Sequence, residues 1–226
     1  MAHIARPTAV AFDIIGTTFS LEALRGPLQE IGLDDSLDLW FTRSLRDAFA
    51  LAVTGAYVPF RRVLGGNLEA LAAEKGRALD ANGRDRVLDR FASLPPQPDA
   101  QEAFASLADA GVRILALSNG ARASSESLLE KAGLRRFVSD ILSVDDRKMF
   151  KPRAEIYAHA VEASGADKSR VALIAAHAWD VHGAKRAGLM AGYVMRGRQY
   201  PAHFDAPDVN GDGLADVAHA FARARA

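Results

Sequence analysis

The sequence contains no cysteine among its 226 residues. This absence excludes disulfide bonds, a thiolate nucleophile and a zinc site with cysteine ligands. It is typical of proteins in a reducing compartment, so we expect a cytoplasmic location. No apolar run approaches the roughly 18 residues that a membrane-spanning helix needs, and Met1–Pro7 shows no signal-peptide pattern. We therefore expect no association with a membrane.

The chain also lacks an excess of charge of either sign. Its 28 basic and 28 acidic side chains cancel, and neither sign forms a long block. This pattern gives no electrostatic footprint for a nucleic-acid partner. With 49% hydrophobic and 25% charged residues, the composition is that of an ordinary globular protein with room for a core domain and an insertion. A small-molecule substrate, neutral or singly charged, is the expectation.

Five short apolar runs are separated by segments with helical spacing, which predicts βαβ units around a parallel sheet. The runs span residues 9–13, 112–117, 137–144, 171–176 and 191–195. In such an α/β, Rossmann-like core, the carboxyl ends of the strands share one edge. At that edge we expect Asp13, Ser118–Gly120, Lys151–Pro152 and His177–Asp180.

The stretch between the first two runs is far too long for a single crossover. Helical spacing predicts helices over residues 39–53, 64–71 and 84–94, and the three prolines in Ser93–Pro98 predict an extended linker. We therefore expect a core domain of residues 1–20 and 99–226 and an inserted helical cap domain of residues 21–98. An apolar face of this cap could support a homodimer. The tail, Asp208–Gly213, lacks the final acid of a calcium loop and is predicted to form a turn.

Asp13 lies at the tip of the first strand and is followed by a turn containing Gly16. A carboxylate in this position can act as a nucleophile, although it could also cap a turn. Two residues later stands Ile15 rather than an acid, so a leaving group must depart without a proton donor there. Lys151 could hold Asp13 ionised, and Lys148 is its competitor. We favour Lys151 because Pro152 suits the first position of a helix.

The remaining polar groups at this edge have structural alternatives. Ser118 and Asn119 could bind a substrate carboxylate or could only cap a helix. Asp180 could activate water, cap the next helix, or do both. His177 could be structural, or could act as a second base or contact the substrate carboxylate.

The four segments expected at the edge of the sheet, in their order along the chain, resemble the motifs of the haloacid dehalogenase superfamily. The resemblance is strongest to its L-2-haloacid dehalogenase (type II) branch. The similarity includes Gly16–Thr17, Ser118–Gly120, Lys151–Pro152, Tyr157 and Ala178–Asp180, and in the cap Trp40, Leu45 and Phe60 match substrate-pocket positions. The resemblance implies a Rossmann-like core, an inserted cap, and hydrolysis of a small 2-haloacid through an aspartyl ester, with neither metal nor cofactor.

The resemblance also implies roles for individual residues. Asp13, Thr17, Lys151 and Asp180 would be catalytic, with Asp13 as the nucleophile and Asp180 orienting or activating the hydrolytic water. The substrate would be bound by Ile14, Ile15, Phe41, Leu45, Phe60, Ser118, Asn119, Tyr157, His177 and Trp179. Tyr157 would donate a hydrogen bond to a site carboxylate.

Three departures from the family pattern concern the substrate pocket. Phe41 stands where the family has an arginine, and only Arg43 or Arg46 could replace that group. Ala175–His177 stands where the family has Ser-Ser-Asn, and Ile15 replaces an aromatic residue. Two alternatives follow: a magnesium-dependent phosphatase, disfavoured by the missing acids at Ile15 and Ala176, and a degenerate binding protein that keeps only the fold.

Overall fold

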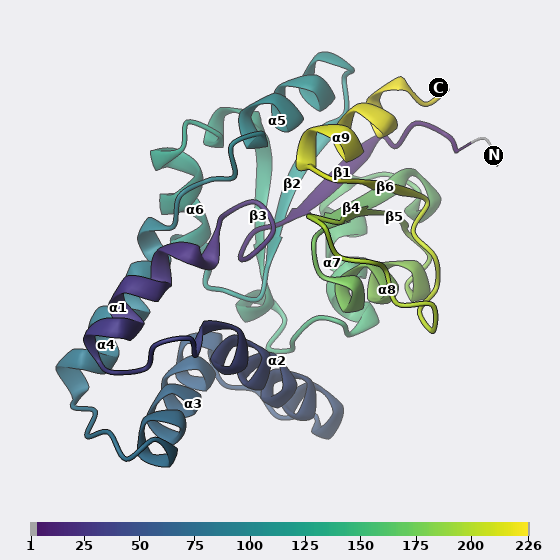
Figure 1. Cartoon of the computed structure of the whole chain (residues 1–226). Helices are drawn as coiled ribbons and strands as arrows, with labels where there is room; N and C mark the ends of the chain where they lie inside the picture. The colour runs from purple at the N-terminus through teal and green to yellow at the C-terminus, as the bar shows by residue number, and fades with distance from the viewer. Residues whose placement is uncertain (1–3, 226) are drawn as a thin grey trace.

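The computed structural model of the chain describes residues 4–225. Met1–His3, within the segment where we expect no signal peptide, and Ala226, at the end of the expected core domain, lie outside the described residues. A parallel sheet of six strands forms the centre, in the order β3-β2-β1-β4-β5-β6 (Figure 1). The strands are β1 (Ala9–Asp13), β2 (Arg113–Ser118), β3 (Val138–Ser143), β4 (Val171–Ala175), β5 (Met190–Val194) and β6 (Val209–Gly211).

All five predicted strands are present, with ends that differ by one residue at most. The prediction of a simple turn in the tail was wrong, because residues 209–211 form β6 and pair with β5. The Asp208 carboxylate explains this pairing. It accepts hydrogen bonds from the Ala191 backbone N–H at 2.7 Å and from Lys185 Nζ at 2.7 and 2.8 Å, which fixes the segment beside β5.

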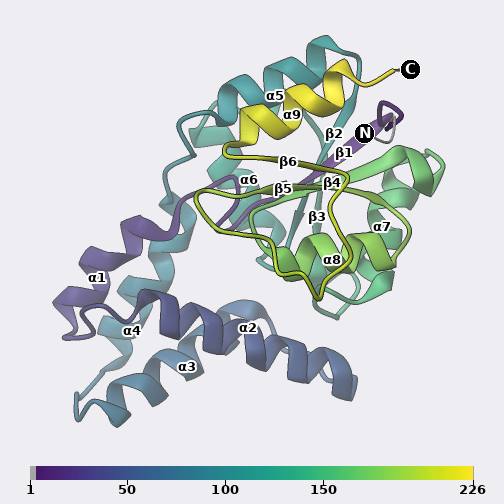
Figure 2. The same cartoon turned by 45° about the vertical axis from the view of Figure 1, so that its right-hand side comes forward.

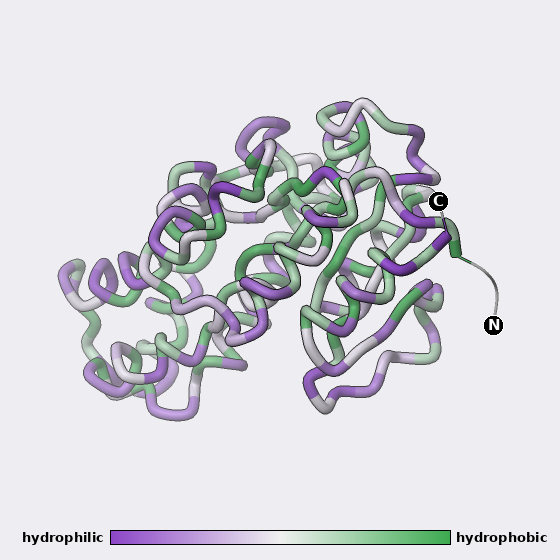
Figure 3. The backbone as a smooth tube through the Cα atoms, turned by 90° about the horizontal axis from the view of Figure 1, so that it is seen from above, coloured by the Kyte–Doolittle hydropathy of each residue, from purple (hydrophilic) through white to green (hydrophobic). Residues whose placement is uncertain are grey.

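Helices cover both faces of the sheet, as the parallel topology requires. Helices α5 (Ala100–Asp109) and α9 (Leu214–Arg223) lie side by side on one face, while α7 (Ala154–Ser164) and α8 (Ala178–Arg186) cover the other (Figures 1 and 2). Helix α6 (Arg122–Lys131) packs on β2 and β3. Every residue of β1 and β4 is buried between these layers. Figure 3 accordingly shows the most hydrophilic segments of the chain mainly at the periphery of the molecule.

Of the segment between β1 and β2, residues 21–93 fold into helices beside the sheet rather than on it, unlike α5 (Figure 1). They are α1 (Arg25–Glu30), α2 (Leu37–Thr54), α3 (Phe60–Glu74) and α4 (Ala81–Asp89), preceded by a 3-10 helix at Leu21–Leu24 and followed by another at Arg90–Ser93. Trp40 lies fully buried, and its indole N–H donates to the Leu64 carbonyl at 2.9 Å. It therefore packs the interior between α2 and α3, although it matches a substrate-pocket position of the family.

The two chain connections between the sheet and these helices run beside each other. The Gln97 N–H donates to the Thr18 carbonyl and the Ser20 N–H to the Pro95 carbonyl, both at 2.9 Å. The extended linker begins at Leu94, because Ser93 still belongs to a 3-10 helix. Division into a core and a cap of residues 21–98 stays a prediction, which this close pairing supports.

Within residues 4–225, no helix combines the length and the apolar character that crossing a membrane requires.

Candidate active site

Asp13 ends β1 at the carboxyl edge of the sheet, and only 4% of the residue is exposed. The chain then turns back on itself, because the N–H groups of Thr18 and Phe19 both donate to the Ile14 carbonyl, at 3.1 and 2.9 Å. The Thr18 hydroxyl donates to the Asp13 carbonyl at 2.7 Å. These bonds fix the backbone that presents the Asp13 carboxylate.

Lys151 lies between two carboxylates. Its fully buried Nζ is 2.8 Å from Oδ1 of Asp13 and 2.6 Å from Oδ2 of Asp180. Burial alone would raise the pKa of Asp13, but the Lys151 ammonium and then His177 more than offset it, so this pKa lies well below its usual value. Burial lowers the pKa of Lys151, and its two carboxylate partners outweigh that effect and raise it. Asp13 is therefore held as a carboxylate.

The position of Lys151 depends on Asn119. The side-chain oxygen of Asn119 accepts the Lys151 backbone N–H at 3.1 Å. Our reason for choosing this lysine was wrong in detail, since α7 begins at Ala154 and not at Pro152. The choice itself agrees with the geometry: Lys148 instead places its Nζ 5.4 Å from the centre of the Tyr57 ring.

Asp180 is fully buried in the first turn of α8. Its Oδ1 accepts the Tyr157 hydroxyl at 2.6 Å, so Tyr157 donates to a site carboxylate as expected. Gly183, one turn further along α8, makes room for this contact, because a Cβ there would overlap the Tyr157 hydroxyl oxygen. Burial raises the pKa of Asp180 despite the opposing attraction of Lys151.

The second oxygen of Asp13, Oδ2, has two partners. The Thr17 hydroxyl donates to it at 2.5 Å, and Nδ1 of His177 lies 3.0 Å away. Thr17 Oγ1 also accepts the Ala176 N–H at 2.9 Å, which ties the turn after β1 to the end of β4. Gly16 is required twice here: its φ is +79°, and a Cβ would lie 2.9 Å from Cε1 of His177.

A cleft of about 730 Å³ opens beside this cluster, between α2 and the carboxyl edge of the sheet. Its walls include four of the predicted substrate-binding residues: Phe41, Leu45, His177 and Trp179. The His177 ring stacks on Trp179 with centroids 5.5 Å apart and lies 6.2 Å from the Phe41 ring. His177 thus lines the cleft and also contacts Asp13.

The other predicted substrate-binding residues do not line this cleft. Phe60 packs against Phe41 at 6.3 Å between ring centres, and Ile14 is fully buried. Ile15 is buried too, and it pairs with Phe19 in an isolated bridge. The buried Ser118 accepts the Gly120 N–H at 2.9 Å through its hydroxyl oxygen. Asn119 and Tyr157 position Lys151 and Asp180, as described above.

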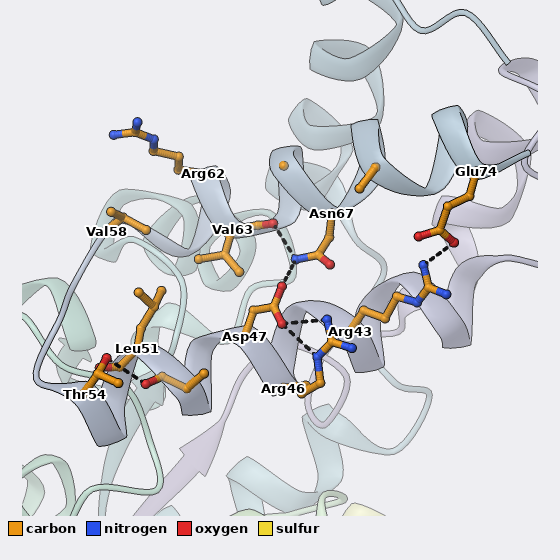
Figure 4. Close-up of a pocket in the computed structure, with 13 residues that line it drawn as sticks. Arg43, Arg46, Asp47, Leu51, Thr54, Val58, Arg62, Val63, Asn67 and Glu74 are labelled. Carbon is orange, nitrogen blue, oxygen red and sulfur yellow. Dashed lines mark hydrogen bonds and ion pairs between the residues drawn. The ribbon is translucent and has the colours of Figure 1, made fainter. Parts of the chain in front are cut away.

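Neither Arg43 nor Arg46 takes the place of the family's arginine. Figure 4 shows both in a groove between α2 and α3, where Arg43 bonds to Glu74 at 2.7 Å and Arg46 to Asp47 at 2.8 Å. Arg46 also reaches the rim of the cleft, but two-thirds of its side chain is exposed. We find no contact of either guanidinium with Asp13 or His177 among the described residues.

Sequence reasoning missed Arg196, which follows β5 and lines the cleft. Its guanidinium donates to the carbonyls of Gly16, at 2.9 Å, and of Thr17. Burial lowers the pKa of Arg196, an effect that nearby Asp99 opposes. Its place directly after a strand could have revealed it, because the ends of all parallel strands share the catalytic edge.

In the part of the chain from residue 4 to 225, no group of three or more His, Cys, Asp and Glu side chains is arranged to hold a metal ion. Between Asp13 and Asp180, the positive charge comes from Lys151.

Comparison with known proteins places this geometry in a family. A sequence model of the haloacid dehalogenase-like hydrolases matches residues 7–188. An (S)-2-haloacid dehalogenase of Pseudomonas sp. (strain YL) is 28% identical over 94% of this chain and 93% of its own. The (S)-2-haloacid dehalogenase 4A of Burkholderia cepacia is 29% identical over 88% of this chain and 87% of its own. The solved structure of the L-2-haloacid dehalogenase from Xanthobacter autotrophicus has the same fold, with a TM-score of 0.87 at 24% identity. The match covers 94% of this chain and 97% of that one.

Proposed function

We propose that the protein, which belongs to the haloacid dehalogenase-like hydrolases, hydrolyses the carbon–halogen bond of small (S)-2-haloacids. The family match and the α/β fold agree with the resemblance stated from the sequence. The names of the relatives supply the substrate class and its handedness. The single observation that carries the proposal is the buried Lys151 ammonium, which holds Asp13 ionised at 2.8 Å beside a largely apolar cleft.

In the first step, Asp13 attacks the carbon that bears the halogen and forms an ester. The halide leaves with the bonding electrons and, as a very weak base, needs no proton. This agrees with Ile15 at a position where an acid would be needed for a basic leaving group. The rings of Phe41 and Trp179 line the cleft and exclude water from the attacking carboxylate. Ser118 and Asn119 lie at the edge of the sheet outside this cleft, so we propose that the haloacid reaches beyond the cleft and that the Ser118 hydroxyl and the backbone N–H groups at Ser118–Asn119 bind its carboxylate.

In the second step, water attacks the ester and releases the 2-hydroxyacid. We propose Asp180 as the group that takes the proton from this water, because burial raises its pKa toward that of an effective base. Lys151 and Tyr157 orient Asp180, at 2.6 Å each. Residues 21–98 act as the cap that closes over the edge of the sheet.

The test is halide release from (S)- and (R)-2-chloropropionate and from chloroacetate. We expect release from the (S) enantiomer, none from the (R) enantiomer, and none from an Asp13→Asn variant. Mass spectrometry of Asp180→Asn should show the 1-carboxyalkyl group of the substrate added at Asp13. In a single turnover in H₂¹⁸O, the product hydroxyl should carry ¹⁶O from the enzyme.

The same assays distinguish the alternatives. Magnesium-dependent hydrolysis of p-nitrophenyl phosphate, without halide release, would identify a phosphatase. Binding of 2-haloacids without either reaction would identify a degenerate binding protein. The homodimer and the cytoplasmic location stay predictions; the exposed Leu39 and Val53 on α2 offer apolar surface for the former.

A further inference from the structure

The two oxygens of the Asp13 carboxylate differ in how many donors they have. Oδ1 accepts one hydrogen bond, from Lys151 at 2.8 Å. Oδ2 has two partners, the Thr17 hydroxyl at 2.5 Å and His177 Nδ1 at 3.0 Å. Each carboxylate oxygen offers two lone pairs. Both lone pairs of Oδ2 are therefore engaged, whereas Oδ1 retains one that can attack carbon.

The hydrogen of the His177 contact belongs to the imidazole. Because Lys151 and His177 keep the pKa of Asp13 well below its usual value, the carboxyl is ionised and can only accept. We therefore assign the hydrogen to Nδ1 of His177. The ring is held in this orientation by its stack on Trp179, at 5.5 Å, and by its close approach to Gly16.

Building on the proposed function, we propose that Oδ1 of Asp13 is the attacking atom and that Thr17 and His177 form an oxyanion site around Oδ2. When Oδ1 bonds to carbon and the halide leaves, Oδ2 becomes the carbonyl oxygen of the ester. The two donors already point at this atom. They are thus aimed at the position where negative charge develops in the second step, which is the arrangement that accelerates acyl transfer.

Hydrolysis of the ester passes through a tetrahedral intermediate at Cγ of Asp13. The oxygen of water bonds to Cγ of Asp13, its proton passes to Asp180, and the electron pair of the Cγ=Oδ2 bond moves onto Oδ2. The bond from Cγ to Oδ1 then breaks as the carbonyl forms again. The departing alkoxide, which keeps Oδ1, takes the proton held by Asp180, and the second proton of the water is released to solvent as the Asp13 carboxylate is restored. The hydrogen bonds from Thr17 and His177 strengthen while Oδ2 carries the full charge.

In this role His177 acts in the second chemical step, the hydrolysis of the ester, and not in the first, the formation of the ester. The test compares His177→Leu, which has no donor, with His177→Asn, whose amide can donate but cannot act as a base. Halide release in a single turnover reports ester formation, and intact mass reports the ester that remains. His203→Leu, a change at an exposed histidine, is the matched control.

We expect His177→Leu to release halide no more slowly than the wild type but to hydrolyse the ester about 10²-fold more slowly, the effect of losing one oxyanion donor. The ester should then accumulate. His177→Asn should recover most of the hydrolysis rate. Equal hydrolysis rates in His177→Leu and the wild type would overturn the inference, and so would a His177→Asn variant as slow as His177→Leu, which indicates a base.

If His177→Leu fails to fold, Thr17→Val and Thr17→Ser repeat the comparison at the other donor: ester should accumulate in the valine variant and not in the serine variant, and the absence of that difference would overturn the inference. If the wild type itself releases no halide, the proposed function is wrong and the inference falls with it. Halide release by the wild type with unaffected ester hydrolysis in the variants contradicts the inference alone.

Discussion

Nζ of Lys151 lies 2.8 Å from Oδ1 of Asp13, although 138 residues separate the two in the sequence. The contact joins the first strand to the loop that follows β3. Because neither side chain is appreciably exposed, the charge of each depends on the presence of the other. The ionisation of the nucleophile and the folding of the core are therefore coupled.

Lys151→Met should lose both activity and stability. Without the ammonium, Asp13 and Asp180 become two neighbouring buried carboxylates with no cation between them. Breaking a buried ion pair on one side costs about 3–5 kcal/mol. We expect a loss of that size in the free energy of unfolding in urea and no measurable halide release. Lys148→Met, at an exposed position, is the control and should match the wild type in both.

The stability contributed by Asp13 should depend on pH with a defined sign. A carboxyl whose pKa is lower in the folded chain stabilises the fold above its unfolded pKa, about 4, and this contribution is lost as pH falls through the folded value. The wild type should therefore exceed Asp13→Asn in unfolding free energy by a constant amount above about pH 5. The difference should shrink below about pH 4. Urea unfolding of both proteins across this range checks it, and a difference that grows with acid would contradict the assigned direction.

Tyr157→Phe should slow ester hydrolysis. The substitution removes the hydroxyl that donates to Oδ1 of Asp180 at 2.6 Å and leaves a buried carboxylate with one donor fewer. We expect a loss of about 1–3 kcal/mol in stability and accumulation of the ester in intact-mass spectra. Tyr200→Phe, which removes a hydroxyl bonded to the Asp205 carbonyl, is the matched control. Equal ester levels in the two variants would exclude a role for Tyr157 in orienting Asp180.

Phe41→Ala should open the wall of the cleft. Phe41 is 7% exposed and packs against the rings of Phe60 and His177. Truncating a buried phenylalanine costs about 3–5 kcal/mol, and water should then reach the site and raise KM for the haloacid. Leu39→Ala, a truncation at a largely exposed position of the same helix, should change neither the stability nor KM. An unchanged KM in Phe41→Ala would show that this ring does not contact substrate.

Arg196→Gln should loosen the turn after Asp13. The guanidinium holds the carbonyls of Gly16 and Thr17, so its loss leaves two backbone acceptors without their donor. We expect stability to fall by about 1–3 kcal/mol and kcat to fall as the Thr17 hydroxyl loses its fixed position. Arg186→Gln, whose side chain is 71% exposed, is the control. Wild-type kcat in Arg196→Gln would show that the turn is rigid without this residue.

The sequence was sufficient to predict strands β1 to β5 and the cluster at the edge of the sheet. Continuous apolar runs identify buried parallel strands, and the ends of such strands meet at one edge whatever the loops do. That rule brings Asp13 and Asp180 together, and the loop after β3 carries Lys151 to the same edge. The direction of Tyr157 toward a carboxylate followed from the family resemblance and agrees with the geometry.

What the sequence did not reveal depends on contacts between side chains and backbone. Residues 209–211 pair with β5 because of the carboxylate of Asp208. The hydrophobic periodicity of the sequence does not predict this contact. Arg196 acts through two backbone carbonyls and belongs to none of the motifs that carry the family resemblance. Arg43 and Arg46 point away from Asp13 because acidic neighbours on α2 and α3, Asp47 and Glu74, bind their guanidinium groups.

The paired connections at residues 18–20 and 95–97 bring the two ends of the helical segment close together. Since the chain leaves the sheet and returns to it at neighbouring points, the distance that any replacement must bridge is short. A foreign helical hairpin with equally close ends could be grafted there while β1 and β2 keep their register. Chimeras of this kind would let the chemistry of one scaffold be combined with the selectivity of another.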